Sequence, residues 1–90
     1  MLRLASSGRF KRDVKRAAKR GKDMQKLREV IDLLLAETPL PTRYRDHPLK
    51  GNWIGWRDLH IEPDWLLIYR IANERLELAA SGTHADLFDE

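Results

Sequence analysis

The most chemically specific residues of this 90-residue chain are its three histidines, His47, His60 and His84. His60 stands in the segment DLHIEPD, in which Asp58 and Asp64 flank it. Imidazoles titrate near neutral pH, so such a set can both accept and donate protons there. It suits metal-free cleavage of RNA, in which one group takes the proton of the 2′-hydroxyl and another protonates the departing 5′-oxygen.

Metal binding is the competing chemistry for the same residues. Imidazoles and a carboxylate can hold a transition metal, but their spacing lacks a compact motif such as HxxxH or HExxH. The sequence therefore predicts no metal site and no cofactor. For His60 alone, a surface histidine without a role is an equally good interpretation, and only the other two histidines favour a chemical site.

The N-terminal residues predict a short strand and a basic helix. Leu2 and Leu4 alternate with a basic residue, as in a strand, and Ser6 or Ser7 can cap a helix that continues to Gly21. This helix is apolar only along a narrow stripe, which consists of Phe10, Val14, Ala17 and Ala18. We expect it to bury that stripe and to expose its other faces.

A second helix is predicted over residues 24–36, with Asp23 as its cap. Its apolar residues form a wider stripe, so we expect it to be the more buried helix. The segment TPLP at 38–41 ends it, because a residue that precedes proline disfavours helical backbone. Residues 42–52 are predicted to form an irregular polar loop.

From Trp53 onward the apolar period changes to two, which predicts three strands joined by the turns EPDW and ANER. In the first strand, the face away from the helices is expected to carry Trp56, Asp58, His60 and Glu62. In the last strand, Leu76, Leu78 and Ala80 are expected to share a face. The order β-α-α-β-β-β predicts a single α+β domain over residues 1–90, with an antiparallel sheet and both N-terminal helices packed on one face.

This arrangement can bring the histidines together. His47 precedes the first strand of the meander and His84 follows the last, so both can reach the exposed face that carries His60. Three nearby cations, Arg45, Lys50 and Arg57, could stabilise negative charge on a phosphate. Each of them alone is equally well explained as a solvated charge.

Two aromatic side chains are candidates for contact with RNA. Trp56 shares the predicted polar face with His60 and could stack on a base. Phe88, in a polar C-terminal segment, could pack either on the sheet or on a nucleotide.

Charge is distributed unevenly along the chain. Residues 1–26 hold ten lysines and arginines against two acids, although the net charge of the whole chain is only +3. This predicts contact with a polyanion, above all nucleic acid, through the first helix; a solvated face that favours solubility is the alternative. The candidates on that helix are Arg9, Lys11, Arg12, Lys15, Arg16, Lys19 and Arg20.

The composition excludes several classes of protein. The absence of cysteine excludes disulfides and thiolate nucleophiles. The N-terminal segment has no apolar core of a signal peptide, and the longest apolar runs are far shorter than the roughly 20 residues of a membrane helix. We therefore expect a cytoplasmic protein.

Several segments together resemble the YafQ branch of the RelE/ParE toxin superfamily. They are KDM…L, YRDHPLKGNWIGWRDLHIEPDWLLIYR and GTHADLF, and the resemblance spans essentially the whole chain. It implies a RelE-like fold and a toxin of a type II toxin–antitoxin module. Such a toxin enters the ribosomal A site and cleaves messenger RNA there without a metal, by attack of the 2′-hydroxyl. A DinJ-like antitoxin neutralises it, and the complex of the two represses its own operon by binding operator DNA.

The resemblance also implies roles for particular residues. Asp64 and His84 are both candidates for proton transfer; we take Asp64 as the base and His84 as the acid, with His47 and His60 orienting and neutralising the phosphate. Phe88 is implied as a substrate contact, and the basic residues of the first helix are implied as a ribosome-binding surface. The matching active-site positions are His47, Asp58, His60, Asp64, His84 and Phe88.

Two other functions fit part of the pattern. A non-catalytic RNA-binding module would explain the basic helix but would leave the histidines a coincidence. A gyrase-inhibiting toxin of the ParE type would share the fold, but it gives no reason for His47, His60, Asp64 and His84 to occur together.

Overall fold

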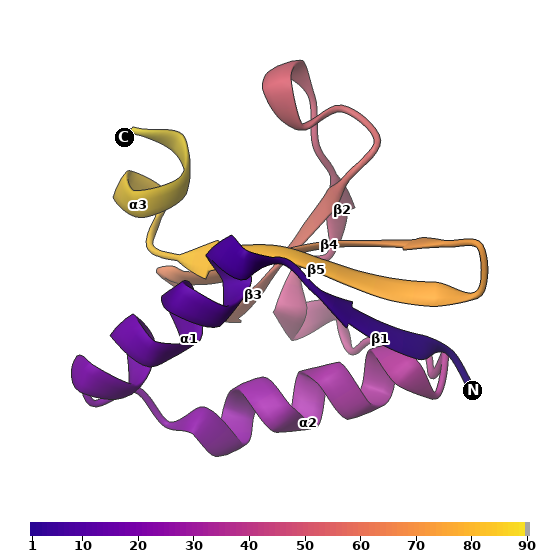
Figure 1. Cartoon of the computed structure of the whole chain (residues 1–90), viewed down its shortest axis with the longest axis horizontal. Helices are drawn as coiled ribbons and strands as arrows, with labels where there is room; N and C mark the ends of the chain where they lie inside the picture. The colour runs from indigo at the N-terminus through magenta and orange to yellow at the C-terminus, as the bar shows by residue number, and fades with distance from the viewer. Residues whose placement is uncertain (90) are drawn as a thin grey trace.

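The computed structural model describes residues 1–89 as a five-stranded sheet with two long helices against one face (Figure 1). The strands are β1 (Arg3–Ser6), β2 (His47–Pro48), β3 (Arg57–Glu62), β4 (Trp65–Ala72) and β5 (Arg75–Gly82). The helices are α1 (Gly8–Lys19), α2 (Met24–Leu35) and the short α3 (His84–Phe88), with 3-10 turns η1 (Thr42–Tyr44) and η2 (Gly51–Trp53).

The order of the strands in the sheet is β1-β5-β4-β3-β2. Strands β3, β4 and β5 form the predicted antiparallel meander, and β2 adds antiparallel to β3. The α+β fold is confirmed, with one difference, because β1 runs parallel to β5 and the sheet is mixed. No hairpin joins β1 to its neighbour: the chain leaves β1 into the helices, so a tight turn does not dictate its direction.

The predicted helix ends are confirmed by local hydrogen bonds. The Ser7 side chain accepts from the backbone N of Phe10 at 2.9 Å, and the Asp23 side chain accepts from the backbone N of Gln25 at 3.0 Å. Gly21 follows α1 with a φ of +80°, a left-handed conformation that glycine adopts without steric cost. Serine and aspartate therefore set where the two helices begin.

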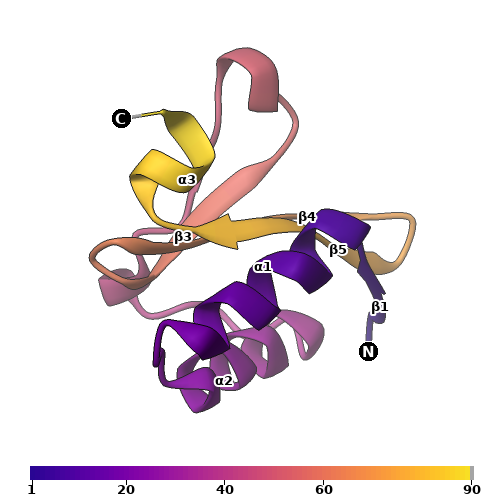
Figure 2. The ribbon, with the colours of Figure 1, turned by 60° about the vertical axis from the view of Figure 1, so that its left-hand side comes forward.

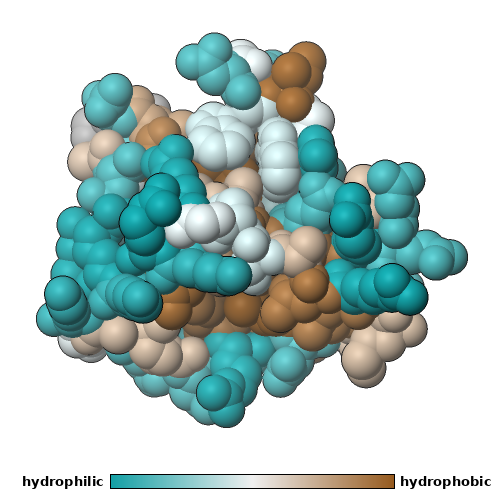
Figure 3. Space-filling view, in the orientation of Figure 1, coloured by the Kyte–Doolittle hydropathy of each residue, from teal (hydrophilic) through white to brown (hydrophobic). Residues whose placement is uncertain are grey.

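The main core lies between the two long helices and the sheet. Phe10, Leu27, Val30 and Leu34 from the helices meet alternate residues of the strands, including Leu59, Trp65, Leu67, Leu76 and Leu78. Figure 2 shows α1 and α2 side by side on this face of the sheet, with α3 on the opposite side. Figure 3 shows apolar side chains between α1 and α2, beside the hydrophilic side chains that cover α1.

A second, smaller core covers part of the opposite face. Leu66, Ile68, Ala80 and Leu87 are buried there, and the residues packed against them include Leu49, Trp53, Trp56 and Phe88. The loop before β3 and α3 supply this cover. Because β4 is apolar on both of its faces, both faces need to be shielded from water. The face that was expected to be open to solvent is therefore partly enclosed.

Two irregularities in the ladder change which side chains share a face. A register shift between His60 and Glu62 turns Glu62 toward Lys22 and Lys26, so the prediction that Glu62 shares a face with His60 is wrong. A second shift, in the pairing of β4 with β5, puts Ala80 in the second core instead of beside Leu76 and Leu78. An extra residue in one strand breaks the period of two beyond it.

The segment expected to be an irregular loop is partly ordered by η1, β2 and η2. Its two-residue strand, β2, pairs His47 with Asp58 across the sheet. Within residues 1–89, the structure has no helix with the length and apolar character needed to cross a membrane.

Candidate active site

Four elements converge to bring the three histidines together. Strand β2 places His47 opposite Asp58 of β3, and His60 lies two residues farther along β3. His84 is the first residue of α3, directly after β5, and Asp64 lies in the turn between β3 and β4. All six residues expected in the active site, including Phe88 at the end of α3, therefore lie on these elements.

His47 is hydrogen-bonded to a backbone carbonyl and lies close to a buried carboxylate. Its Nδ1 lies 2.9 Å from the carbonyl O of Arg45 and 3.0 Å from Oδ1 of Asp58. A carbonyl oxygen only accepts, so Nδ1 carries the proton and Nε2 is left for exchange with a substrate. Asp58 was predicted on an exposed face, but it is buried, with only 3% of its surface exposed. Burial raises the pKa of Asp58, and the nearby charges of His47, His60 and His84 oppose that rise.

His60 is the neighbour of both other histidines. Its ring centroid lies 6.4 Å from that of His47 and 5.6 Å from that of His84. Burial lowers the pKa of His60; the charge of Asp58 opposes this effect, whereas the charges of His84, Arg45 and His47 add to it. His60 is therefore neutral at pH 7 and can accept a proton.

His84 and Asp64 form a hydrogen-bonded pair. The ring Nδ1 of His84 lies 2.6 Å from Oδ1 of Asp64, and the backbone N of His84 donates to the same oxygen at 2.8 Å. These bonds, the backbone bond first, lower the pKa of Asp64 below the usual range of a carboxyl. The carboxylate accepts from Nδ1, so Nε2 is the ring nitrogen of His84 that remains for proton exchange.

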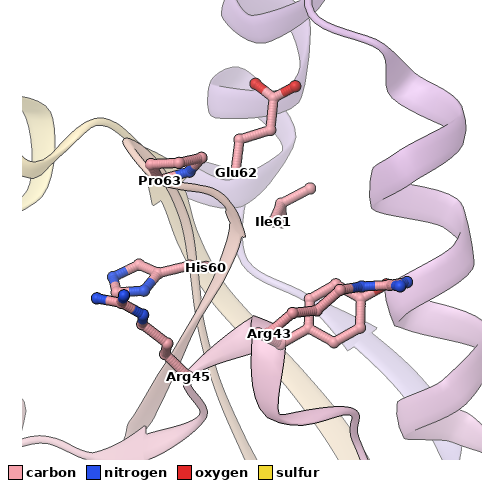
Figure 4. Close-up of a pocket in the computed structure, with 7 residues that line it drawn as sticks. Arg43, Arg45, His60, Ile61, Glu62 and Pro63 are labelled. Atoms are coloured by element: carbon pink, nitrogen blue, oxygen red, sulfur yellow. The ribbon is translucent and has the colours of Figure 1, made fainter.

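The three cations expected near the phosphate lie in different places. Arg45 lies beside His60 at the edge of a pocket (Figure 4). Lys50 is exposed in the loop before η2. Arg57 points to the other face of β3, where its guanidinium makes an ion pair with Asp46 at 3.0 Å. Of the three cations, Arg45 therefore lies beside the histidines, whereas Arg57 is bound to Asp46 on the other face of β3.

The two aromatic candidates border the second core. Trp56 is half-buried, with the Arg70 guanidinium 4.1 Å from its ring centroid and the Trp53 ring packed edge-on at 6.2 Å. Phe88 is half-buried at the end of α3, four residues after His84. Phe88 therefore shares a short helix with a site histidine, whereas Trp56 mainly covers the sheet.

The basic residues of α1 divide into two groups. Arg9, Arg16 and Arg20 reach toward acids or toward α3: Arg16 pairs with Asp13 at 3.0 Å, and Arg20 pairs with Asp86 at 2.7 Å. The backbone carbonyl of Asp86 accepts from Arg9 at 3.4 Å. Within residues 1–89, no ion pair involves the other four candidates on this helix, which are Lys11, Arg12, Lys15 and Lys19.

Asp86 is a supporting residue that the sequence interpretation missed. Its side chain accepts from the backbone N of Thr83 at 2.9 Å, and the Thr83 hydroxyl accepts from the backbone N of Asp86 at 3.0 Å. This reciprocal capping box sets the start of α3, where His84 lies. The sequence does contain a sign of this role: Thr83 and Asp86 in GTHADLF have the T-x-x-D spacing that is typical of a helix start.

A buried network fixes the end of β5 before α3. Asp13 of α1 accepts from the backbone N of Ser81 at 3.0 Å, and the Ser81 hydroxyl donates to the carbonyl of Leu66 at 2.7 Å. The indole of Trp65 donates to the same hydroxyl at 3.1 Å. No sequence pattern pointed to the bond between Asp13 and Ser81, because the two residues lie 68 positions apart along the chain.

Comparison with known proteins places the chain among bacterial toxins. The family model described as "Bacterial toxin of type II toxin-antitoxin system, YafQ" matches residues 2–89. The mRNA interferase toxin YafQ of Escherichia coli K12 is 53% identical over 83 residues, which cover 91% of this chain and 90% of that protein.

Solved structures agree with that similarity. The crystal structure of YafQ from Escherichia coli BL21(DE3) matches with a TM-score of 0.93 at 48% identity, covering 98% of this chain and 99% of that one. The toxin in the Escherichia coli DinJ–YafQ complex matches with a TM-score of 0.91 at 49% identity over the same shares of the two chains. A match over nearly the whole length, in sequence and in fold, shows that the chain belongs to the YafQ family of bacterial toxins of type II toxin–antitoxin systems.

Proposed function

We propose that this protein is a toxin that inhibits translation as a ribosome-dependent mRNA endoribonuclease. The observation that carries the proposal is the pairing of two unlike histidines whose ring centroids are 5.6 Å apart. His60 is neutral because burial lowers its pKa, whereas His84 is held by the Asp64 carboxylate. The similar Escherichia coli protein is an mRNA interferase, which supports the same substrate here.

The reaction is a transesterification within the RNA. Neutral His60 takes the proton of the 2′-hydroxyl, and the 2′-oxygen attacks the adjacent phosphorus. The bond from phosphorus to the 5′-oxygen breaks, and His84 gives its proton to that leaving oxygen. The products are a 2′,3′-cyclic phosphate and a 5′-hydroxyl, so no water, metal or cofactor enters the step.

This assignment differs from the choice of Asp64 as the base that we made from the sequence. Its carboxylate accepts two hydrogen bonds from His84, and these bonds lower its pKa, which makes it a weaker base. We assign Asp64 to orienting His84 and stabilising its protonated ring. His47 stands beside His60 and neutralises charge on the phosphorane.

The ribosome supplies what a chain of 90 residues lacks. Two imidazoles act together only if the scissile phosphate is held in line between them, and orientation of this kind contributes greatly to rate. A codon held open in the A site meets that need. The proposed site of action is therefore the cytoplasm, where mRNA is translated.

Primer extension on a defined mRNA tests this function. The mRNA is incubated with the protein in chelator, with and without ribosomes, and wild type is compared with His84→Ala and Asp64→Ala. We expect cleavage within codons only when ribosomes are present, and a loss of about 100-fold or more for His84→Ala. Intact mRNA in every lane, from protein with native circular dichroism, would remove the nuclease proposal.

A DinJ-like antitoxin is the proposed partner, because the similar Escherichia coli toxin crystallises in complex with DinJ. The groove between α1 and α2, of about 470 Å³, is lined mainly by apolar side chains, among them Val14, Ala18 and Ile31 (Figure 3). An open apolar surface of this kind is typical of a protein interface. Binding of operator DNA is proposed only for the complex with the antitoxin.

Titration calorimetry with the antitoxin tests the groove as its docking site. Ala18→Arg places a long cation in the groove at an exposed helix position and should weaken the complex at least tenfold. Ala36→Arg, an exposed alanine after the end of α2 and outside the groove, is the matched control. Equal affinity of both variants would place the antitoxin elsewhere.

A further inference from the structure

A pocket of about 460 Å³ opens beside His60, between η1 and the end of β3 (Figure 4). It is lined by residues 43–45 and 60–63. This volume lies within the range of sites that hold small ligands, roughly 300–1,000 Å³. His60 is the residue that this pocket shares with the histidine cluster.

Arg45 places a cation between the pocket and the histidines. Its backbone has a φ of +49°, and its carbonyl accepts from His47, so the residue is tied to the active site. Figure 4 shows its guanidinium alongside the His60 ring. The charge of Arg45 also contributes to the lowered pKa of His60, after burial and the charge of His84. A phosphate that approached His60 from the pocket would meet this guanidinium.

Arg43 and Tyr44 form a flat wall of the pocket. The Arg43 guanidinium lies 4.8 Å from the centroid of the Tyr44 ring, and it donates to the Tyr44 hydroxyl at 3.0 Å. Tyr44 is buried, so the ring supports the exposed arginine. A guanidinium plane stacks well on nucleobases. Ile61 and Pro63 supply apolar surface nearby.

Glu62 is the one acidic residue in the lining, and its charge is compensated from outside the pocket. Its carboxylate pairs with Lys26 at 2.9 Å and with Lys22 at 3.3 Å. The hydrogen bond from Lys26 is the largest of the effects that lower the pKa of Glu62. Figure 4 shows the carboxylate turned away from Arg45. The pocket can therefore accept an anion.

We infer that this pocket binds the nucleotide next to the cleaved bond, with its phosphate on Arg45 and its base against the wall formed by Arg43 and Tyr44. The inference rests on the proposed nuclease function and adds a substrate subsite to it. The scissile phosphate lies between His60 and His84, so the pocket on the other side of His60 receives the adjoining nucleotide. Codon preference would then arise partly at Arg43.

Steady-state cleavage on programmed ribosomes tests the subsite. Arg45→Gln and Arg43→Gln should each raise the ribosome concentration that gives half-maximal rate by about tenfold, the effect of losing one charge-assisted contact. Their maximal rates should change much less, because neither side chain transfers a proton. Arg75→Gln, which removes an exposed arginine at the start of β5, should behave as wild type.

An abasic nucleotide beside the cleavage position separates base stacking from general charge. In wild type, removal of the base should raise the half-maximal concentration, whereas in Arg43→Gln it should add little, because the two changes remove the same contact. If the effects of the abasic nucleotide and of Arg43→Gln on the half-maximal concentration were fully additive, the subsite would be overturned. It would also be overturned if Arg43→Gln and Arg45→Gln had the same half-maximal concentration as Arg75→Gln. If wild type did not cleave programmed ribosomes at all, the nuclease proposal itself would fall, and the subsite with it.

Discussion

At the scale of single residues, the three histidines differ because their partners differ. His47 faces a buried carboxylate, His84 faces an exposed one, and His60 has no hydrogen-bonded carboxylate within residues 1–89. The same side chain therefore meets three different environments within a few ångströms. Burial favours the neutral ring of His60, which suits a base, and the Asp64 carboxylate orients His84 as its partner.

The role of His60 as base predicts the acid limb of the pH–rate profile. Burial lowers the pKa of His60 below the ordinary histidine value of about 6.5. A base works only when unprotonated, so the rate should fall as the pH drops through the lowered pKa of His60. Single-turnover cleavage measured on programmed ribosomes across this range checks it. His60→Gln should be about 100-fold slower or worse and should lack this limb; a limb that persists would assign the titration to another group.

Two substitutions at Asp64 separate its charge from its geometry. Asparagine keeps an acceptor for the backbone N and for Nδ1 of His84 but removes the negative charge, whereas alanine removes both. We expect Asp64→Asn to slow single-turnover cleavage about tenfold and Asp64→Ala more, because His84 then loses its orientation as well. Equal rates for the two variants would mean that charge alone matters.

At the scale of elements, α3 is a five-residue helix that depends on α1 for its position. Asp86 joins the two helices through Arg20 and, at 3.7 Å, through Arg16. At Gly82, directly before α3, an added Cβ would stand 2.8 Å from Cβ of Asp86, so the approach leaves no room for a side chain. Three arginines that the sequence suggested for RNA or the ribosome therefore help to hold the helix that carries His84.

Asp86→Asn should destabilise the protein in a pH-dependent way. The bond to Arg20 and the capping bonds hold the pKa of Asp86 well below its usual range. A depressed folded pKa gives stability that is present above the unfolded value of about 3.9 and is lost as the pH falls toward the folded pKa. Urea unfolding at neutral pH should show a loss of about 1–2 kcal/mol, and the difference from wild type should shrink in acid.

Asp89→Asn is the matched control for that experiment. It removes the same charge from an exposed position at the end of α3. We expect its stability to follow that of wild type at every pH, and its cleavage rate to be unchanged. A pH-independent loss in Asp86→Asn would attribute the effect to capping geometry and not to charge.

At the scale of the whole molecule, charge and chemistry lie on different parts of the surface. The histidine cluster stands by β3 and α3, whereas Lys11, Arg12, Lys15 and Lys19 project from α1 with no ion pair within residues 1–89. Figure 3 shows the hydrophilic side chains that cover α1. Unpaired cations contribute most to binding a phosphate backbone, because they release counterions without first breaking an ion pair.

Replacing Lys11, Lys15 and Lys19 together by glutamine should weaken ribosome binding for every mRNA sequence alike. Each lost phosphate contact should also reduce the slope of log K against log salt by about one. Ribosome pelleting at several salt concentrations measures both quantities. A triple variant with glutamine at Arg3, Arg28 and Arg75, which lie on other elements, should keep more of the salt slope. Equal slopes for the two triple variants would mean that the lysines of α1 contribute no more to ribosome binding than other surface cations do.

Features that depend on neighbouring residues can be predicted from the sequence. Serine and aspartate caps mark where α1 and α2 begin, the two apolar periods separate helices from strands, and the order of elements predicts an α+β fold. The histidines and their flanking carboxylates indicated a site on β3, although the resemblance to a toxin family was needed to name the roles. These signals are readable because caps and periodicity act over one or two turns of the chain.

Features that depend on strand register and on distant partners emerge only in the folded chain. The register shift after His60 turned Glu62 away from His60, and Asp58 is buried in the folded chain. Arg57 forms an ion pair with Asp46. Arg20 forms one with Asp86, which lies 66 positions away along the chain. A charge takes its role from whatever the fold brings within a few ångströms, because Coulomb energies and desolvation change steeply over that distance. Residue type and spacing alone carry no information about such neighbours.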